Sequence, residues 1–269
     1  MEKYDLHAHL FTIWERGMLS FERASREPEV ILDAIQTAGL DGIGLADFQD
    51  HRFAKLASYV REGQKLGRDG RYKVVKKLRN SLVFATGTGL INIIRVQEVR
   101  TQEGDVSFIG LDDNINLPYR HRLEATLDLG RGFGAPIVAN HPFGMFGIGR
   151  CNLMVYANYL TAFEKGNCNY RNLKPEEILG IEEQTGLNGI DVSDSHNLGD
   201  LGNGYIIISG AVDTRSEDAV IESIRHHLTT GGFKPYTRRK NPVASRLGHL
   251  ALAFYDCKIR RPLRLIETA

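Results

Sequence analysis

Cysteine is scarce in this chain, and long apolar runs and internal repeats are absent. Only three of the 269 residues are cysteines, Cys151, Cys168 and Cys257, and they lie far apart. An odd number at such spacings excludes a disulfide framework and a zinc ribbon, and it predicts a reducing, cytoplasmic setting. No apolar run is long enough to span a membrane, and the first residues lack the basic and apolar regions of a secretory signal.

Net charge is also small, because 34 basic side chains oppose 33 acidic ones, but the charge is unevenly distributed. Residues 234–264 hold nine basic residues and one acidic residue, so this segment carries +8 and the rest about −7. Such a segment predicts a phosphate-rich partner such as nucleic acid, or else a solvated extension or an oligomer contact. We therefore expect a domain over residues 1–233 and a basic C-terminal extension over residues 234–269.

The rest of the sequence repeats a pattern in which a helix leads into an apolar strand. Residues 28–38 carry apolar side chains at helical spacing, and Gly39 ends this helix before the apolar stretch 40–47. The same order recurs in helix 121–131 with strand 135–140, and in helix 175–184 with strand 189–192. Continuous apolar strands are typical of a parallel sheet that is covered on both faces, so the pattern predicts an α/β fold.

Ionisable residues stand where several of these strands end. His7-Ala8-His9 follows a short apolar run, and side chains in a strand alternate with period two, so both imidazoles lie on the same side. Neutral imidazole is a common metal ligand. In a barrel of strand–helix units the carboxyl ends of the strands carry the site. The residues at predicted strand ends are His7, His9, Asp47, Glu98, His141 and Asp213.

The order of these residues resembles the PHP family, the polymerase and histidinol phosphatase domains, over about residues 4–230. The resemblance implies an α/β fold, a distorted (β/α)7 TIM-like barrel, which holds up to three divalent metal ions and hydrolyses phosphate esters. It also implies ligand roles. His7 and His9 match the first motif, Glu98 the glutamate that can bridge metals, His141 the histidine before proline, and Asp213 the aspartate of the late Ser-Asp-x-His motif.

The sequence departs from the family pattern in three places. The family has Asp-His after its second strand, whereas this chain has Asp47-Phe48, with His51 three residues later. The histidine expected in the second strand of a hairpin is Ser107. The segment 209–215 contains no histidine, and Asp213 fits the late motif only with a one-residue shift. We therefore expect an incomplete ligand set, with Asp47 and His51 on or next to the metal.

Mixed imidazole and carboxylate ligands favour Zn, Mn or Fe over Ca, and we expect one to three such ions. Two ions about 3.5–4 Å apart can bind both the attacking water and the phosphoryl oxygens. Arg215 could pair with a substrate phosphate, or form an ordinary salt bridge. His196 follows strand 189–192 and could be a replacement ligand, a general acid for the leaving group, or a plain loop histidine.

Three functions stay open on the sequence. The ligand set favours a metal-dependent phosphoesterase that acts on a phosphomonoester or a nucleotide-type ester, with Asp47, His196 and Arg215 as its catalytic residues. A metal-dependent amidohydrolase also carries His-x-His after its first strand. A barrel that has lost catalysis and binds RNA or another phosphate-rich partner through residues 234–264 would account for the missing ligands and the basic segment.

Overall fold

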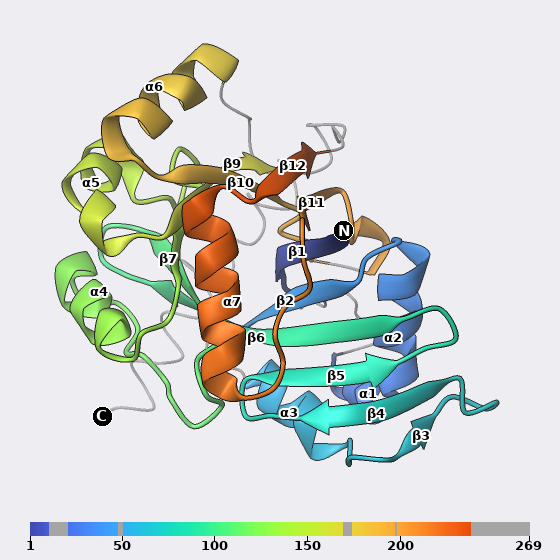
Figure 1. Ribbon diagram of the computed structural model, residues 1–269. Helices are drawn as coiled ribbons and strands as arrows, with labels where there is room; N and C mark the ends of the chain where they lie inside the picture. Colours follow the sequence, from blue (N-terminus) through green and yellow to red (C-terminus); the bar gives the residue numbers. More distant parts are fainter. Residues whose placement is uncertain (11–20, 48–50, 169–173, 197, 238–269) are drawn as a thin grey trace, which may run out of the picture.

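The computed structural model of the chain describes residues 1–10, 21–47, 51–168, 174–196 and 198–237 (Figure 1). The strands, in chain order, are β1 (Glu2–Ala8), β2 (Gly42–Asp47), β3 (Lys65–Leu66), β4 (Tyr72–Lys77), β5 (Ser81–Ala85), β6 (Leu90–Arg100), β7 (Asp105–Ile109), β8 (Ile137–Ala139), β9 (Ala162–Asn167), β10 (Asn188–Val192), β11 (Gly204–Ile208) and β12 (Phe233–Thr237). The α-helices are α1 (Phe21–Arg26), α2 (Pro28–Thr37), α3 (Arg52–Ser58), α4 (Leu123–Gly132), α5 (Gly149–Val155), α6 (Pro175–Thr185) and α7 (Glu217–Thr230). Two short 3₁₀ turns, Ala157–Tyr159 and Leu198–Asp200, complete the described elements.

One sheet curves into a nearly closed barrel whose strands follow the order β10-β9-β8-β7-β6-β2-β1. Strands β1, β2 and β6 are mutually parallel, as are β8, β9 and β10, whereas β7 runs antiparallel between the two groups. The two ends of this path meet where Ala8 forms a parallel bridge with Ser195 and the His9 N–H donates to the Ser195 carbonyl. The predicted distorted TIM-like barrel is confirmed, with one of its strands reversed.

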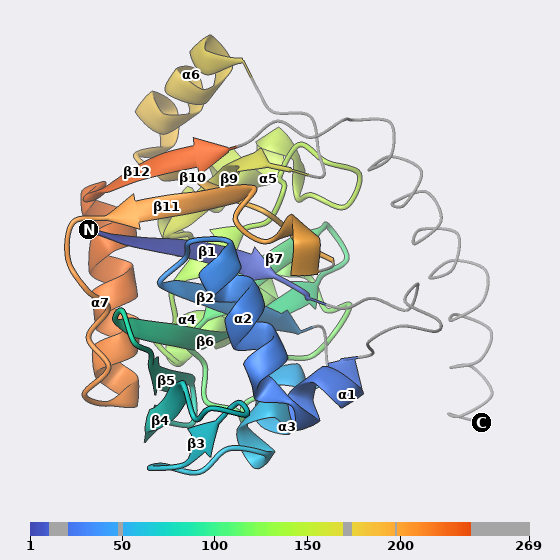
Figure 2. The same ribbon diagram turned by 90° about the vertical axis from the view of Figure 1, so that its right-hand side faces the viewer.

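The barrel is closed by α7 at the end where β1 begins (Figure 2). Val220 and Ile224 of α7 pack in one apolar cluster with Tyr4 and Leu6 of β1. Helix α7 starts at Ser216, whose hydroxyl caps it by accepting from the Ala219 N–H. Because this end of the barrel is filled by apolar packing, polar side chains can gather only at the opposite end, where the parallel strands finish.

The side chains of β2 alternate between the outer and the inner face of the barrel wall. Ile43 and Leu45 point outward into the cluster that contains the apolar face of α2, and Ala46 joins the cluster inside the barrel. Gly44 is also on the inner side, where a Cβ would collide with the Leu6 backbone and with Val96. Both faces are therefore apolar or small, which explains the uninterrupted apolar sequence of this strand.

Strands β11 and β12 extend the sheet beyond β1. Strand β11 is antiparallel to β1, with Ile208 opposite Glu2, and β12 is antiparallel to β11. Residues 234–237 thus pair in the sheet as part of β12, while residues 238–269 lie outside the described residues. The predicted boundary at residue 233 and the role of the basic extension stay predictions.

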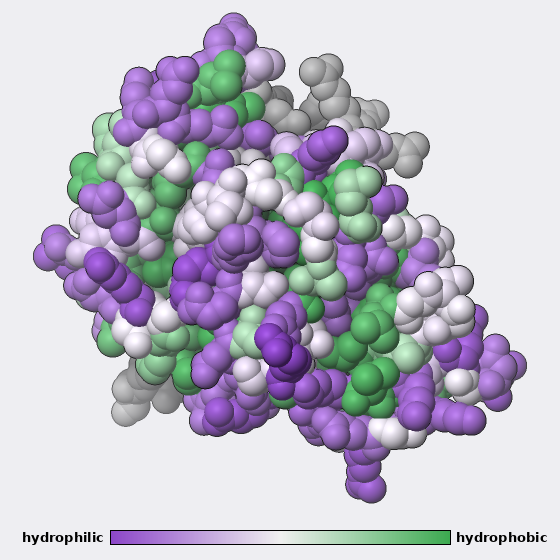
Figure 3. Space-filling model, viewed as in Figure 1, coloured by the Kyte–Doolittle hydropathy of each residue, from purple (hydrophilic) through white to green (hydrophobic). Residues whose placement is uncertain are grey.

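The surface that carries α7 mixes hydrophilic and hydrophobic residues, with hydrophilic ones predominating (Figure 3). In the described part of the chain, none of the helices combines the length and the apolar composition that crossing a bilayer requires.

Candidate metal centre

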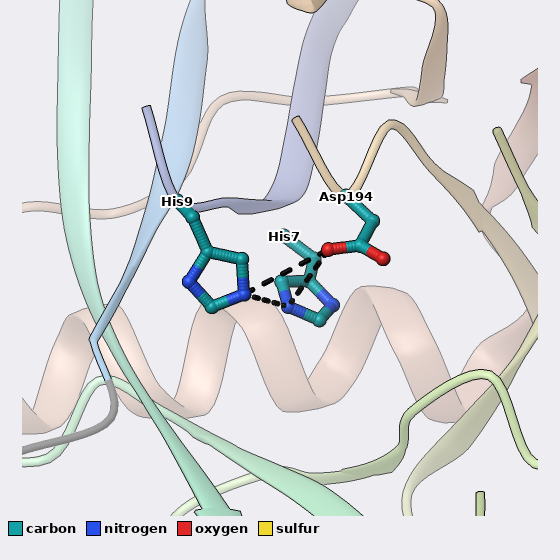
Figure 4. A group of neighbouring side chains, drawn as sticks. All are labelled: His7, His9 and Asp194. Carbon is teal, nitrogen blue, oxygen red and sulfur yellow. Dashed lines mark hydrogen bonds and ion pairs between the residues drawn. The ribbon is translucent and has the colours of Figure 1, made fainter. Parts of the chain in front are cut away.

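Two imidazoles from the end of β1 meet in the barrel interior (Figure 4). The Nε2 atoms of His7 and His9 lie 3.0 Å apart, and each residue is about 1 % exposed. The pairing register of β1 shifts between Asp5 and Ala8, next to the bridge to Ser195. As the His-x-His spacing predicts, both rings reach the same side of the strand end.

Two carboxylates complete a compact set of ligand atoms. Glu98 Oε2 lies 2.9 Å from His9 Nε2 and 3.5 Å from His7 Nε2. Asp194 Oδ1 lies 3.8 Å from His7 Nε2 and 3.7 Å from His9 Nε2. Ligand atoms at about 2.0–2.1 Å from a tetrahedral ion stand roughly 3.3 Å from one another. The observed separations bracket this value. His7, His9 and Asp194 form a group that could hold one divalent metal ion, and Glu98 lies within 3.5 Å of both imidazoles.

A third carboxylate sets the orientation of His7. Glu164 Oε1 lies 2.6 Å from His7 Nδ1, and Glu164 Oε2 accepts hydrogen bonds from the His141 N–H and from Asn167 Nδ2. An ionised carboxylate can only accept hydrogen bonds, so the hydrogen of neutral His7 lies on Nδ1. The lone pair of Nε2 then faces the other ligand atoms. A carboxylate behind a ligating histidine is the usual outer support of a metal site.

The second oxygen of Glu98 faces a different group. Glu98 Oε1 accepts a hydrogen bond of 2.8 Å from Asn140 Nδ2 and lies 3.6 Å from His141 Nε2. The rings of His7 and His141 are 6.4 Å apart, so both belong to one site. Glu98 therefore stands between the His7–His9 pair and His141, with one oxygen facing each of them.

Two residues of the site have a strained backbone. His141 has φ of +29° and Asp194 has φ of +48°, values that non-glycine residues rarely adopt. Each such residue costs about 1–3 kcal/mol and persists only where its surroundings hold it. The bond from the His141 N–H to Glu164 is one such restraint. Such strained residues are typical of functional sites, so their presence at two candidate ligands supports a functional role for this region.

The electrostatics of the cluster favour a bound cation. Burial by itself lowers the pKa of His7 and His141, but the neighbouring carboxylates outweigh it, raising His7 well above its ordinary pKa and His141 to a pKa of about 9. Burial raises the pKa of Glu98 and Asp194, but the adjacent imidazoles outweigh it. They hold Glu98 well below its ordinary pKa and Asp194 at a pKa of about 2. Charged carboxylates thus pull positive charge into a buried space, and a metal ion can replace the imidazole protons.

His196 lies beside the cluster and toward its exposed edge. Its ring stacks on His9 with centroids 4.9 Å apart, and its Nε2 lies 3.6 Å from Asp194 Oδ1. The side chain is 20 % exposed, unlike the nearly inaccessible His7 and His9. The structure therefore brings His196 together with the predicted ligands, in contact both with the cluster and with solvent.

Asp213 and Arg215 are not brought to this site, which corrects the sequence assignment. Because β11 is antiparallel to β1, the residues that follow β11 lie at the end of the barrel that α7 covers. There the Asp213 carboxylate accepts from Arg215 Nε and Nη2, and the side chain of Arg215 is 88 % exposed. The two residues form a surface ion pair at the opposite end of the barrel from His9.

Asp47 and His51 are also outside the cluster. Asp47 shares the outward side of β2 with Ile43 and Leu45, and its carboxylate lies 3.8 Å from the Arg95 guanidinium. His51 is exposed at the start of α3, whereas the ligand atoms are buried. Phe48, the other departure at this position, lies outside the described residues.

Sequence reasoning missed Asp194 and Glu164. Ser193-Asp194-Ser195-His196 spells the late Ser-Asp-x-His motif directly and follows β10, so the signal for Asp194 was present. Glu164 belongs to β9, a strand that the sequence analysis did not predict. Its signal was weaker, because a single carboxylate follows only two apolar residues there.

Glu164→Gln tests the support that this residue gives to His7. The substitution keeps the shape but removes the charge that fixes the His7 tautomer, and loss of such a partner typically costs about 10–100-fold in metal affinity. We expect a weakening of this size for Zn²⁺, measured by competition with a chromogenic chelator. Glu182→Gln on α6 is the control, and an unchanged affinity in Glu164→Gln would contradict the assigned role.

The fold and the cluster define the chain as an α/β barrel with a candidate divalent-metal centre at the carboxyl ends of its strands. Comparison with known proteins agrees with this class. A family model described as PHP-associated matches residues 181–228, which include Asp194 and His196. A search of curated protein sequences gave no match.

Two solved structures share the fold. PsfC from Pseudomonas syringae PB-5123 is 17 % identical with a TM-score of 0.56, over 93 % of this chain and 98 % of that one. A two-domain protein from Bacteroides vulgatus ATCC 8482, which contains a predicted PHP-like metal-dependent phosphoesterase, is 17 % identical with a TM-score of 0.51. That match covers 88 % of this chain and 65 % of the larger protein. These likenesses confirm the fold, and the PHP-associated model over residues 181–228 agrees with the predicted resemblance to the PHP family.

Proposed function

We propose that this chain is a metal-dependent phosphoesterase that hydrolyses a phosphomonoester or a nucleotide-type phosphate ester. The observation that carries the proposal is the convergence of His7 Nε2, His9 Nε2, Glu98 Oε2 and Asp194 Oδ1 in one buried space. The description of the Bacteroides vulgatus protein as containing a predicted PHP-like metal-dependent phosphoesterase supports the reaction class.

The residues of the site would have three roles in such a reaction: holding the ion, orienting His7 and donating a proton. A bound divalent ion polarises a phosphoryl oxygen and lowers the pKa of water. His7, His9, Glu98 and Asp194 would hold the ion, and Glu164 keeps the His7 lone pair directed at it. His196 contacts both solvent and Asp194, so its Nε2 would donate a proton to the leaving oxygen.

Metal content and substrate preference test the proposal together. Protein purified without chelator is expected to contain Zn, Mn or Fe by elemental analysis and to hydrolyse members of a panel of phosphate monoesters and nucleotides. Removal of the ion by chelation should abolish the activity, and adding back one of the three ions should restore it.

Assays of amide hydrolysis and RNA binding beside this panel separate the other two functions. Hydrolysis of amides but not of phosphate esters would contradict the proposal in favour of an amidohydrolase. A metal-free protein that binds RNA, with an affinity that falls steeply with salt, would instead favour a non-catalytic barrel acting through the basic residues 234–264. The cytoplasmic setting and a nucleic-acid partner stay predictions.

A further inference from the structure

We propose that the centre holds one divalent ion rather than two, because the guanidinium of Arg100 takes the place of a second ion; this inference rests on the proposed function. Beside the His7–His9 pair, a second group of buried side chains could accept a cation. Glu98, Asp105 and His141 each offer a ligand atom, and these atoms lie within 4.8 Å of one another. Without other partners, these three residues would form a second metal site that shares Glu98 with the first.

Arg100 already occupies the carboxylate of this second group. Its Nε donates to Asp105 Oδ1 at 2.8 Å and its Nη2 donates to Asp105 Oδ2 at 2.7 Å. The two residues are direct partners across the β6–β7 hairpin, and Asp105 is about 1 % exposed. A bidentate pair of this kind neutralises the Asp105 carboxylate and holds a positive charge within 2.8 Å of both oxygens, so a second divalent cation there would be repelled.

An amide engages the other carboxylate of the group. Asn140 Nδ2 donates to Glu98 Oε1 and to Ser107 Oγ, both at 2.8 Å. Ionised Glu98 can only accept hydrogen bonds, so the amide must present its NH₂ group to Oε1. That hydrogen bond takes up part of the acceptor capacity of the oxygen through which Glu98 would reach a second ion.

The position of Arg100 also suits it to bind substrate. It follows Glu98 by two residues on β6 and therefore lies on the same side of the strand, nearer the open end. Its guanidinium lies 4.2 Å from the centre of the Phe146 ring, and its side chain is 20 % exposed. Guanidinium keeps its charge at all working pH values, so Arg100 attracts a phosphate group while its Nε and Nη2 donate to Asp105. We assign to Arg100 the phosphoryl contact that a second ion would otherwise make.

Counting bound ions tests the inference without relying on turnover. Titration with Mn²⁺ or Zn²⁺, followed by elemental analysis, is expected to give one ion per wild-type chain. Arg100→Met releases Asp105 and should bind two ions, whereas Arg100→Met/Asp105→Asn should return to one. The KM for a phosphate monoester should rise at least about tenfold in Arg100→Met/Asp105→Asn, because that variant has neither the guanidinium nor a second ion to contact the phosphate.

Arg215→Met is the matched control, because Arg215 also forms a bidentate pair with an aspartate, but at the far end of the barrel. It should bind one ion and keep the wild-type KM. Two ions in the wild-type protein, or one ion in a folded Arg100→Met variant, would overturn the inference alone. Absence of any ion in the wild-type protein would overturn the proposed function as well. Arg100→Gln, expected to bind two ions, replaces Arg100→Met if circular dichroism shows that the latter is unfolded.

Discussion

Replacing His7 and His9 together by alanine is expected to abolish metal binding and phosphoesterase activity. The two Nε2 atoms supply half of the four ligand atoms that surround the candidate ion. A catalytic ion is worth several kcal/mol of transition-state stabilisation, and about 1.4 kcal/mol corresponds to a tenfold change in rate. Loss of the ion should therefore reduce kcat/KM by about 10³-fold or more, measured beside the metal content of the same preparation.

The control for this double substitution is His226→Ala/His227→Ala. These two histidines lie in the C-terminal half of α7, the helix that covers the other end of the barrel. Removing them takes away two imidazoles without touching the cluster, so metal content and activity should stay within about twofold of wild type. A folded His7→Ala/His9→Ala protein that still hydrolyses phosphate esters would refute the metal centre.

Asp194→Asn is expected to reduce kcat/KM by about 10²-fold or more and to weaken metal binding. Asparagine keeps the shape of the side chain but removes a charge that lies within 4 Å of three imidazoles, those of His7, His9 and His196. A neutral amide oxygen is a poorer ligand for a divalent ion, and it no longer attracts positive charge into the buried space. Steady-state kinetics and a Zn²⁺ titration on the same protein measure both effects.

Asp213→Asn makes the same chemical change at the position that the sequence suggested. Asp213 pairs with the highly exposed Arg215, and exposed ion pairs contribute little to stability. We expect wild-type metal affinity and kcat/KM. The opposite pattern, with loss of activity in Asp213→Asn and none in Asp194→Asn, would show that the aspartate assigned from the structure is not the ligand.

Much of the site follows from local sequence pattern. His7, His9, Glu98 and His141 each lie at or near the end of a strand that the sequence indicates, and the alternation of side chains puts the two β1 histidines on one side. The barrel itself follows from helices that lead into apolar strands, such as α2 into β2. These features depend on short stretches of chain, so they can be predicted from the sequence alone.

Other members of the site depend on how the strands are arranged. Asp213 follows an apolar strand just as His141 does, but β11 is reversed relative to β1 and delivers Asp213 to the wrong end of the barrel. Asp47 follows β2 at the correct end, but its place in the alternation turns it outward to Arg95. Glu164 becomes significant only because β9 lies between β8 and β10, which puts its carboxylate behind His7.

The amino-acid sequence by itself determined where strands end and which side of each strand a side chain faces, since both are properties of a few consecutive residues. Only the tertiary structure decided which strand ends lie together at the same end of the barrel. Strand direction is fixed by pairing between segments far apart in the chain, such as β1 with β11 and with the bridge at Ser195. That pairing puts Asp194, and not Asp213, beside His7 and His9.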